Sequence, residues 1–415
     1  MDVAVRHPGS HRWRPRLRGS TIPPALRISE GSARMGLSGV ASRRIGMGLG
    51  AVAAALVVAV LGAGWYYAGE IEDGALKVEH EPDEYDVAVV ALGAGRITLR
   101  GPEDTDPRSH PGTVGLEWPG GYARVGGIAE VRGLDAVRAY APVEGALTVG
   151  DLVRYDSFAF PQDPGRAHGM AFQEVRFASP LGELAAWYVD GTGDTWVILV
   201  HGKSADRGEA LRTLPVVQAA GLPALVITYR NDEAAPRDPS GNHQFGATEW
   251  EDLDAAARYA LDHGAADLIV VGYSMGGAIV ASFLYESPLA GRVAGAILDS
   301  PMLDLGAAVD LGGRNRGLPQ FLTDVAKVIS SVRFGIDWEA FDHLARTDEL
   351  SPPILLFHGD ADATVPVQTS EALAESRRDI VTYLPFPGAR HVGAWNIDPE
   401  RYNAAVREFI ERVAR

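Results

Sequence analysis

The sequence contains no cysteine among its 415 residues. Disulfides, thiolate nucleophiles and cysteine-based metal sites are therefore excluded. Lysine is almost absent too, because Lys77, Lys203 and Lys327 stand against 35 arginines. Together with many alanines, glycines and valines, this bias suggests a GC-rich bacterial genome. No HExxH, P-loop or dinucleotide-binding glycine motif occurs. The sequence therefore gives no reason to expect a metal or an organic cofactor.

Basic residues are scarce beyond the N-terminus. Residues 1–44 hold nine arginines against two acidic residues, so the rest of a chain of formal charge −16 carries about −23. Phosphate binding needs a basic face, and an acidic folded portion argues against a nucleic-acid partner. Residues 1–44 mix Pro, Gly, Ser and Arg without periodicity. We expect a disordered tail there, which could touch anionic lipid heads or include a misplaced start before Met35.

Charged residues are missing altogether from Ile45–Ala68. A helix of this length spans about 36 Å, enough to cross a hydrocarbon core of about 30 Å. Arginines precede the run, acidic residues follow it, and the aromatic residues 65–67 lie at its far end, where membrane interfaces favour them. The sequence therefore predicts a transmembrane helix at 45–68 in the cell membrane, crossing once, with a cytoplasmic N-terminus and an extracytoplasmic C-terminal part.

Two other interpretations of this run are a cleaved signal peptide and a buried core helix. The preceding segment is long for a signal peptide, and no clear small-x-small cleavage site precedes the aromatic residues, although a start at Met35 would shorten it. A core helix would normally show a polar face, which this run lacks. The sequence favours the anchor over both.

Short alternating segments follow between Asp73 and Gly165. They read YDVAVVAL, GRITLRG, TVGLEWPG and ALTVGDLVRYDSF, and Gly, Pro and Asp separate them. This spacing is typical of a small β-rich unit. The segments contain no set of residues that suggests catalysis. We therefore predict that region 73–165 serves packing or positioning.

From residue 166 to 415, apolar runs alternate with helical patterns. EVRFAS and ELAAWYVDG predict a hairpin, and six further runs predict strands at 196–202, 223–231, 267–274, 293–300, 352–360 and 381–388. Several runs are continuously apolar, as in strands buried on both faces of a mostly parallel sheet. Intervening helices predict right-handed crossovers and hence a doubly wound α/β sheet. Residues 302–350 are an insertion with the amphipathic FLTDVAKVISSVRF, which could form a lid.

One hydroxyl lies between a predicted strand and a predicted helix. The segment Gly272-Tyr273-Ser274-Met275-Gly276 fits the pattern G-x-S-x-G, and its strand–turn–helix context gives that pattern meaning. So sharp a turn strains the serine backbone, and flanking glycines remove clashes. We therefore predict that the Ser274 hydroxyl is a nucleophile.

A serine nucleophile needs a base, and the base needs a group that orients it. Asp360 and Asp362 follow the predicted strand at 352–360, and His391 follows the last strand. All three emerge at the sheet edge where Ser274 lies. The order serine, acid, histidine therefore predicts a triad of Ser274, His391 and one of these aspartates. Asp299, at the end of VAGAILDS, is a further candidate acid.

These motifs together resemble the α/β-hydrolase family from about Glu174 to Arg415. The resemblance is carried by His201-Gly202, GYSMGG, HGDADATVP and GARH. It implies that Asp362 is the triad acid and Asp360 a turn residue. It also implies an oxyanion hole formed by the amides of Met275 and Lys203, although a lysine at that place departs from the usual small or apolar residue.

The resemblance implies a serine hydrolase that acts through an acyl-enzyme without a cofactor. We expect a small acyl substrate, a carboxylester or a thioester. A serine peptidase resembling the prolyl oligopeptidase group is an alternative, but region 73–165 is too short for the large gating domain of those enzymes. An acyl-binding or scaffold protein without activity is another. The substrate-binding residues stay undefined: Arg230, Asn231 and Arg237 could bind an anionic group, or could simply be solvated.

Overall fold

The computed structural model describes residues 38–78, 84–102 and 110–414. Most of the predicted N-terminal tail, residues 1–37, lies outside this part of the chain. Two compact units meet inside the first helix, one ending at Leu56 and the other beginning at Val57. All features discussed below belong to the second unit unless the first helix is named.

The first helix, α1, spans Ser38–Ile71 and is followed by a π-helical turn, η1, at Glu72–Leu76. The helix thus includes residues 38–44, which the sequence analysis assigned to the tail, and the two arginines there are good helix formers. Within the described residues, one helical stretch, Leu49–Leu76, is long and apolar enough to cross a membrane by length and composition. A membrane span there stays a prediction.

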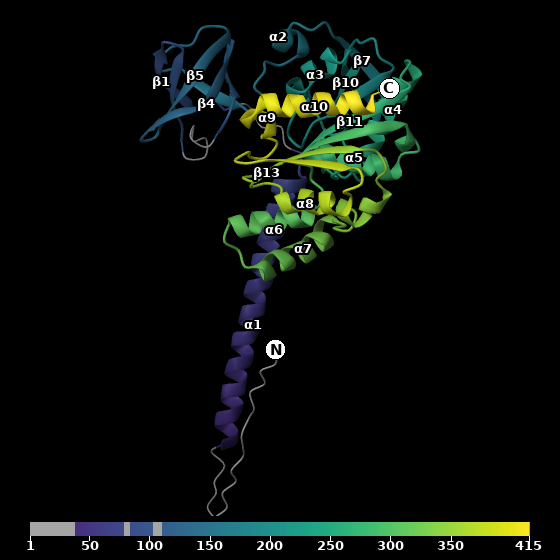
Figure 1. The fold of residues 1–415 in the computed structure, drawn as a ribbon. Helices are drawn as coiled ribbons and strands as arrows, with labels where there is room; N and C mark the ends of the chain where they lie inside the picture. Colours follow the sequence, from purple (N-terminus) through teal and green to yellow (C-terminus); the bar gives the residue numbers. More distant parts are fainter. Residues whose placement is uncertain (1–37, 79–83, 103–109, 415) are drawn as a thin grey trace, which may run out of the picture. The chain divides into compact units, whose positions relative to one another are not determined.

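A closed barrel follows α1 (Figure 1). Its strand order is β1-β2-β5-β4-β3-β6, and the side chains of Ile97, Leu99 and Leu116 are fully buried in its core. The strands are β1 (Val87–Gly93), β2 (Arg96–Arg100), β3 (Val114–Trp118), β4 (Gly121–Arg132), β5 (Asp135–Glu144) and β6 (Leu152–Asp156).

The sequence missed the two longest barrel strands, β4 and β5. Irregularities of register interrupt β4 near Gly126 and Gly127, and most of its second half is exposed. Without a clean alternation of apolar and polar residues, the pattern that predicts a half-buried strand is lost.

The remaining strands form one eight-stranded sheet in the order β14-β13-β12-β11-β9-β10-β8-β7. From β10 to β14 the neighbouring strands are parallel, while β8 is antiparallel to both β7 and β10. Every strand predicted in this half is present: β7 (Gln173–Ser179), β8 (Gly182–Val189), β9 (Thr195–Val200), β10 (Ala224–Ile227), β11 (Asp267–Tyr273), β12 (Val293–Asp299), β13 (Ile354–Gly359) and β14 (Val381–Phe386).

Helices cover both faces of this sheet, as a doubly wound fold requires. One core contains Leu253 of α4 and Ile279 of α5, and the other contains Val217 of α3 and Phe409 of α10. The helices outside the insertion are α2 (Pro164–His168), η3 (Arg207–Arg212), α3 (Leu214–Ala219), α4 (Trp250–Asp262), α5 (Met275–Glu286), η4 (Ala290–Arg292), α8 (Val367–Ser376), α9 (Ala394–Ile397) and α10 (Pro399–Val413).

The insertion after β12 is helical. It contains α6 (Leu305–Asn315), α7 (Gln320–Phe334) and η5 (His343–Glu349). The amphipathic segment singled out from the sequence is α7. The Asn315 side chain donates a hydrogen bond of 3.0 Å from Nδ2 to the carbonyl oxygen of Ala363, so the end of α6 contacts the loop after β13.

Candidate active site

The turn between β11 and α5 is strained at its centre. Ser274 has φ of +49° and ψ of −115°, a backbone conformation that L-residues rarely adopt. A Cβ at Gly276 would lie 2.2 Å from the carbonyl oxygen of Val200, and one at Gly272 would lie 2.5 Å from the carbonyl oxygen of Gly276. Only glycine fits at these two positions. The turn therefore has the geometry that the G-x-S-x-G pattern predicts.

The structure brings Ser274, His391 and Asp362 into one chain of hydrogen bonds. His391 Nε2 lies 2.8 Å from Ser274 Oγ, and His391 Nδ1 lies 2.7 Å from Asp362 Oδ2. The histidine follows β14 and the aspartate follows β13, so residues 117 and 29 positions apart in sequence meet at the carboxyl edge of the sheet. In this arrangement the imidazole can accept the serine proton while its Nδ1–H donates to the carboxylate.

Asp362 is held as a carboxylate inside the protein. Its Oδ1 accepts hydrogen bonds from the amides of Thr364 and Val365, at 2.8 and 2.9 Å. Burial alone would raise its pKa, but the hydrogen bonds from His358 and His391 outweigh burial and hold the pKa of Asp362 well below its ordinary value. A charged carboxylate next to the imidazole favours the imidazolium that forms when the serine loses its proton.

His358 contacts the candidate acid Asp362, and the sequence analysis missed this residue. Its side chain is fully buried at the end of β13, and its Nε2 lies 3.1 Å from Asp362 Oδ2. Its Nδ1 lies 2.7 Å from Ser370 Oγ. With the Ser370 hydroxyl donating to Nδ1, the Nε2–H is directed at the carboxylate. The signal was available, because a polar residue that ends an otherwise continuous apolar strand needs a buried partner.

The other two candidate acids have different surroundings. Asp360 Oδ1 accepts a hydrogen bond of 2.7 Å from the amide of Gly388, as a turn residue would. Asp299 is buried at the end of β12, where its Oδ1 accepts from Ser300 Oγ at 3.2 Å. Burial raises the pKa of Asp299 to about 6. Within the described residues, the carboxylate in hydrogen-bond contact with His391 is that of Asp362.

The two predicted oxyanion donors lie next to the serine. Met275 is the first residue of α5, so its amide has no carbonyl partner within the helix. The loop after β9 passes close by, because a Cβ at Gly202 would lie 3.0 Å from the Cβ of Ser274. The Gly202 amide donates to Glu209 Oε2 at 2.8 Å, which leaves the next amide, of Lys203, as the candidate donor. The Lys203 side chain donates from Nζ to the carbonyl oxygen of Gly74 at 3.0 Å.

A buried ion pair connects two loops of the site. One is the loop after β9 that carries Gly202 and Lys203, called the oxyanion loop below, and the other is the loop after β14 that carries His391. Glu209, which accepts from Gly202, also pairs with Arg212 at 3.3 Å, and both side chains are at least nine-tenths buried. Arg212 Nη1 in turn donates to the carbonyl oxygen of Val392 at 2.8 Å, one residue after His391. Two loops that must keep a fixed separation during catalysis are thus connected through one pair of charges.

Polar side chains of the loop after β10 are bonded to other groups of the protein. Arg230 is buried and pairs with Asp252 at 2.7 Å, and Asn231 is buried as well. The structure therefore brings neither of them to the nucleophile as a free ligand, and Arg237 is exposed. Arg230 and Asn231 are buried and bonded instead of solvated. The sequence could not show this, because their partners are recognisable only in the folded chain. His201 lies nearby, with Nε2 2.9 Å from Asp232 Oδ2; burial lowers its pKa, but Asp232 outweighs burial and raises it to about 9.

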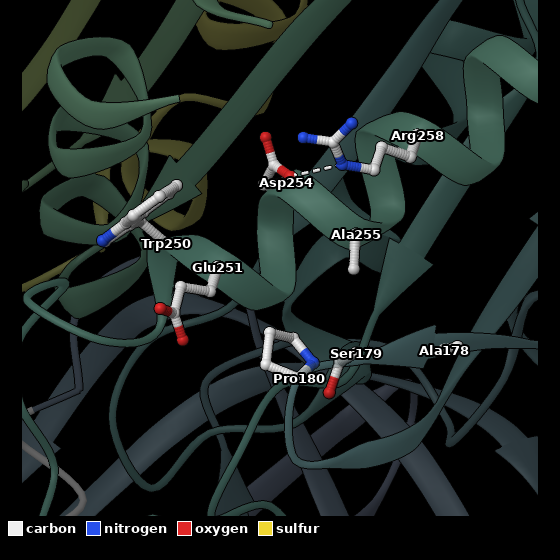
Figure 2. Close-up of a pocket in the computed structure, with 8 residues that line it drawn as sticks. All are labelled: Ala178, Ser179, Pro180, Trp250, Glu251, Asp254, Ala255 and Arg258. Carbon is white, nitrogen blue, oxygen red and sulfur yellow. Dashed lines mark hydrogen bonds and ion pairs between the residues drawn. The ribbon is translucent and has the colours of Figure 1, made fainter. Parts of the chain in front are cut away.

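The cavities of the described residues include a large cleft and a smaller pocket. A cleft of about 1440 Å³ is lined by the oxyanion loop residues Lys203 and Ser204 and by barrel residues such as Trp118 and Tyr122. A smaller pocket of about 390 Å³ lies between the β7–β8 turn and α4, and Figure 2 shows Asp254 and Arg258 of α4 paired beside it. The smaller pocket contains no residue of the hydrogen-bonded chain around Ser274. Across the described ranges, no three His, Asp or Glu side chains are grouped so that they could hold a metal ion.

The sequence of this chain is similar to a family model and to proteins of other organisms. Residues 248–340 match a family model described as serine aminopeptidase, S33. The chain is 26% identical to the alpha/beta hydrolase domain-containing protein WAV2 of Arabidopsis thaliana, over 70% of this chain and 92% of that protein. It is 23% identical to an uncharacterised protein of Mycobacterium tuberculosis, over 56% of this chain and 76% of that one.

Among solved structures, an esterase of Pyrococcus furiosus is similar. The match has a TM-score of 0.50 and 21% identity and covers 62% of this chain and 96% of the esterase. At this identity the likeness concerns the fold. The sheet of β7–β14 and its helices therefore have the fold of the α/β-hydrolases, as the sequence motifs predicted.

Proposed function

We propose that this chain, which has the α/β-hydrolase fold, is a serine hydrolase that cleaves carboxylester or thioester bonds through an acyl-enzyme. The observation that carries the proposal is the hydrogen-bonded chain from Ser274 through His391 to Asp362, with distances of 2.8 and 2.7 Å. The likeness to WAV2 and to the Pyrococcus esterase supports a hydrolase of this kind.

The proposed reaction follows from the positions of these groups. Ser274 Oγ attacks the acyl carbon while His391 Nε2 takes its proton, and Asp362 stabilises the resulting imidazolium. The amides of Met275 and Lys203 receive the negative charge that develops on the acyl oxygen, and each such donor contributes about 10²–10³ in rate. His391 then returns the proton to the leaving alcohol or thiol. Water, activated in the same way, releases the acid from the serine.

A second candidate function is peptide or amide hydrolysis, because the matching family model carries the description serine aminopeptidase. The matched segment spans the elbow and most of the insertion, and it excludes the candidate acid and base. The same triad could cleave either kind of bond, so the choice rests on the leaving group. Steady-state kinetics on acyl esters, acyl thioesters and aminoacyl amides would decide between the two.

A membrane anchor is part of the proposal as well. We infer from the uncharged segment 45–68, the arginines before it and the acidic residues after it that α1 anchors the enzyme, with the hydrolase outside the cytoplasm. Protease treatment of intact cells tests this orientation. If the C-terminal part were digested only after the membrane is permeabilised, the orientation would be wrong.

The nucleophile has a direct test. A fluorophosphonate probe should label the purified protein, and Ser274→Ala should abolish both labelling and turnover of the best ester while urea unfolding changes little. We expect turnover to fall by about 10⁴ or more, because triad members act as a unit. Labelling that persists in Ser274→Ala would assign the nucleophile elsewhere. Absence of labelling in the parent protein would instead favour an acyl-binding or scaffold role.

A further inference from the structure

Helix α7 carries apolar side chains that are exposed on the surface of the protein. Phe321, Val328 and Val332 are 52%, 66% and 83% exposed. Their spacing of seven and four residues places them on one face of the helix. We call these three residues the outer face of α7. The opposite side is packed, since Thr323, Ala326 and Ser330 are buried.

The C-terminal part of α1 lies against the same helix (Figure 1). A Cβ at Gly64 would come 2.4 Å from Val325 Cγ1, so α1 approaches α7 as closely as a glycine permits. Arg333 Nη1 donates to the carbonyl oxygen of Trp65 at 2.8 Å, and its guanidinium lies 4.0 Å from the centre of the Trp65 ring. The aromatic end of the proposed anchor, where it would leave the membrane, is thus fixed beside α7.

Basic side chains lie on and just before α7, and one of them is paired, since Lys327 Nζ lies 2.7 Å from Asp310 Oδ1 of α6. Residues 311–335 contain four basic residues and Asp324 as the acidic one, and acidic residues flank this stretch at Asp310, Asp337 and Glu339. Arg314, at the end of α6, and Arg316, in the turn before α7, are exposed. An apolar helical face with basic residues beside it is the combination that binds the surface of an anionic bilayer.

We propose that the outer face of α7 lies in the lipid surface of the membrane that α1 crosses, and that the substrate reaches the site from that surface. The occupant is the bilayer, because the exposed apolar surface of α1 continues onto this helix. The end of α6 binds the loop of Asp362 through Asn315 and Ala363, so the same insertion borders the acid of the triad. The acyl donor is then a bilayer-borne ester or thioester. This inference rests on the anchor and the hydrolase activity proposed above.

The absence of cysteine makes the contact measurable in the full-length protein. Val332→Cys on α7, Val58→Cys in the middle of α1 and Leu134→Cys in the barrel each provide one labelling site, and the native side chains are 83%, 69% and 61% exposed. Each variant is labelled with bimane and reconstituted in phosphatidylcholine vesicles with one-third phosphatidylglycerol. Quenching by lipids that carry a nitroxide near the headgroup or mid-chain reports contact with the bilayer.

We expect strong quenching at positions 58 and 332, the second mainly by the shallow nitroxide, and little at position 134. Quenching at 58 without quenching at 332 would overturn the inference and leave the anchor standing. Quenching at neither would overturn both. Protection of position 332 that grows with protein concentration in detergent would show a second copy of the chain on α7, and would also overturn it.

Turnover provides the matching functional readout. The double variant Val328→Gln/Val332→Gln should lose at least about fivefold in turnover of a long-chain ester embedded in vesicles and stay within about twofold on a soluble short-chain ester. Thr382→Gln on β14, far from α7 in sequence, serves as a control for a polar substitution elsewhere. Equal losses on both substrates would contradict delivery from the bilayer, whereas no activity on either substrate in the parent protein would refute the proposed hydrolase itself.

Discussion

The buried pair of Glu209 and Arg212 allows a quantitative test of how the site is held together. Arg212→Met removes the charge that balances Glu209, and both side chains are at least nine-tenths buried. Breaking a buried ion pair from one side costs about 3–5 kcal/mol, because the remaining charge is left without a partner. The substitution also removes the hydrogen bonds from Nη1 to Val392 and Asn396, at 2.8 and 3.1 Å. We therefore expect a loss near the upper end of this range.

A double variant separates charge from position. Glu209→Gln/Arg212→Met removes both charges of the pair, and the glutamine oxygen can still accept from the Gly202 amide. The free energy of unfolding should recover by at least about 2 kcal/mol relative to Arg212→Met. Activity should not recover, since the loop of His391 has lost its clamp in both variants. We expect kcat/KM to stay about ten- to a hundredfold below that of the parent in both.

Urea denaturation followed by circular dichroism measures the stabilities, and ester hydrolysis well below the unfolding midpoint measures activity. Arg378→Met is the control, because Arg378 pairs with Glu375 on the surface with side chains 76% and 77% exposed, and such pairs contribute at most about 1 kcal/mol. A loss in Arg212→Met no larger than in this control would refute the reasoning on burial. Recovery of activity in the double variant would show that the pair serves stability alone.

Three further changes test individual contacts. Gly276→Val should abolish activity and cost about 3 kcal/mol of stability in urea, since its Cβ would lie 2.2 Å from the carbonyl oxygen of Val200; a stable, active variant would disprove the strained turn. Asp362→Asn should lower kcat by about 10⁴, while Asp360→Asn, which touches Gly388 and not the base, should cost less than about tenfold; equal losses would contradict the assignment of the acid. Burial raises the pKa of Asp299 from 3.8 to about 6, so the folded state loses stability as pH rises through this window. Asp299→Asn should remove that loss, by up to about 3 kcal/mol at pH 8 in urea titrations. A pH profile of stability that is the same in the variant and the parent would refute this role of Asp299.

The strands around the site could be predicted because they are buried on both faces. In β9 and β13 every residue is buried. Strands of this kind consist of nearly continuous apolar runs, which can be recognised in the sequence without any alternation. The barrel gave a weaker signal. Half of β4 is exposed and its register shifts near Gly126, so its residues follow no simple period. Closure of the barrel, which lets these strands pair on both sides, is a property of the whole that no local window contains.

The residues of the proposed triad could be predicted because motif order and strand order agree. Ser274, Asp362 and His391 each follow a recognisable strand, and parallel strands bring such positions to one edge. Their supports could not be found in this way. His358 and Arg212 act through partners 4 and 180 residues away, and neither of these two contacts is indicated by spacing or by a motif. Only the folded chain shows that these buried polar groups are satisfied by the loops of the site.

The way α1 joins the hydrolase decides whether the proposed anchor could orient the site. A flexible linker would let the enzyme tumble above the membrane, and no face would be presented to the lipid. Here the carbonyl oxygen of Leu76 accepts from the amide of His243 at 2.7 Å, and Gly74 accepts from Lys203 in the oxyanion loop at 3.0 Å. With Trp65 held by Arg333, the chain leaving α1 is fastened to the hydrolase at three separate points. Because one of these points is the loop that carries a proposed oxyanion donor, movement of the proposed anchor relative to the hydrolase would shift the loop that lies beside Ser274.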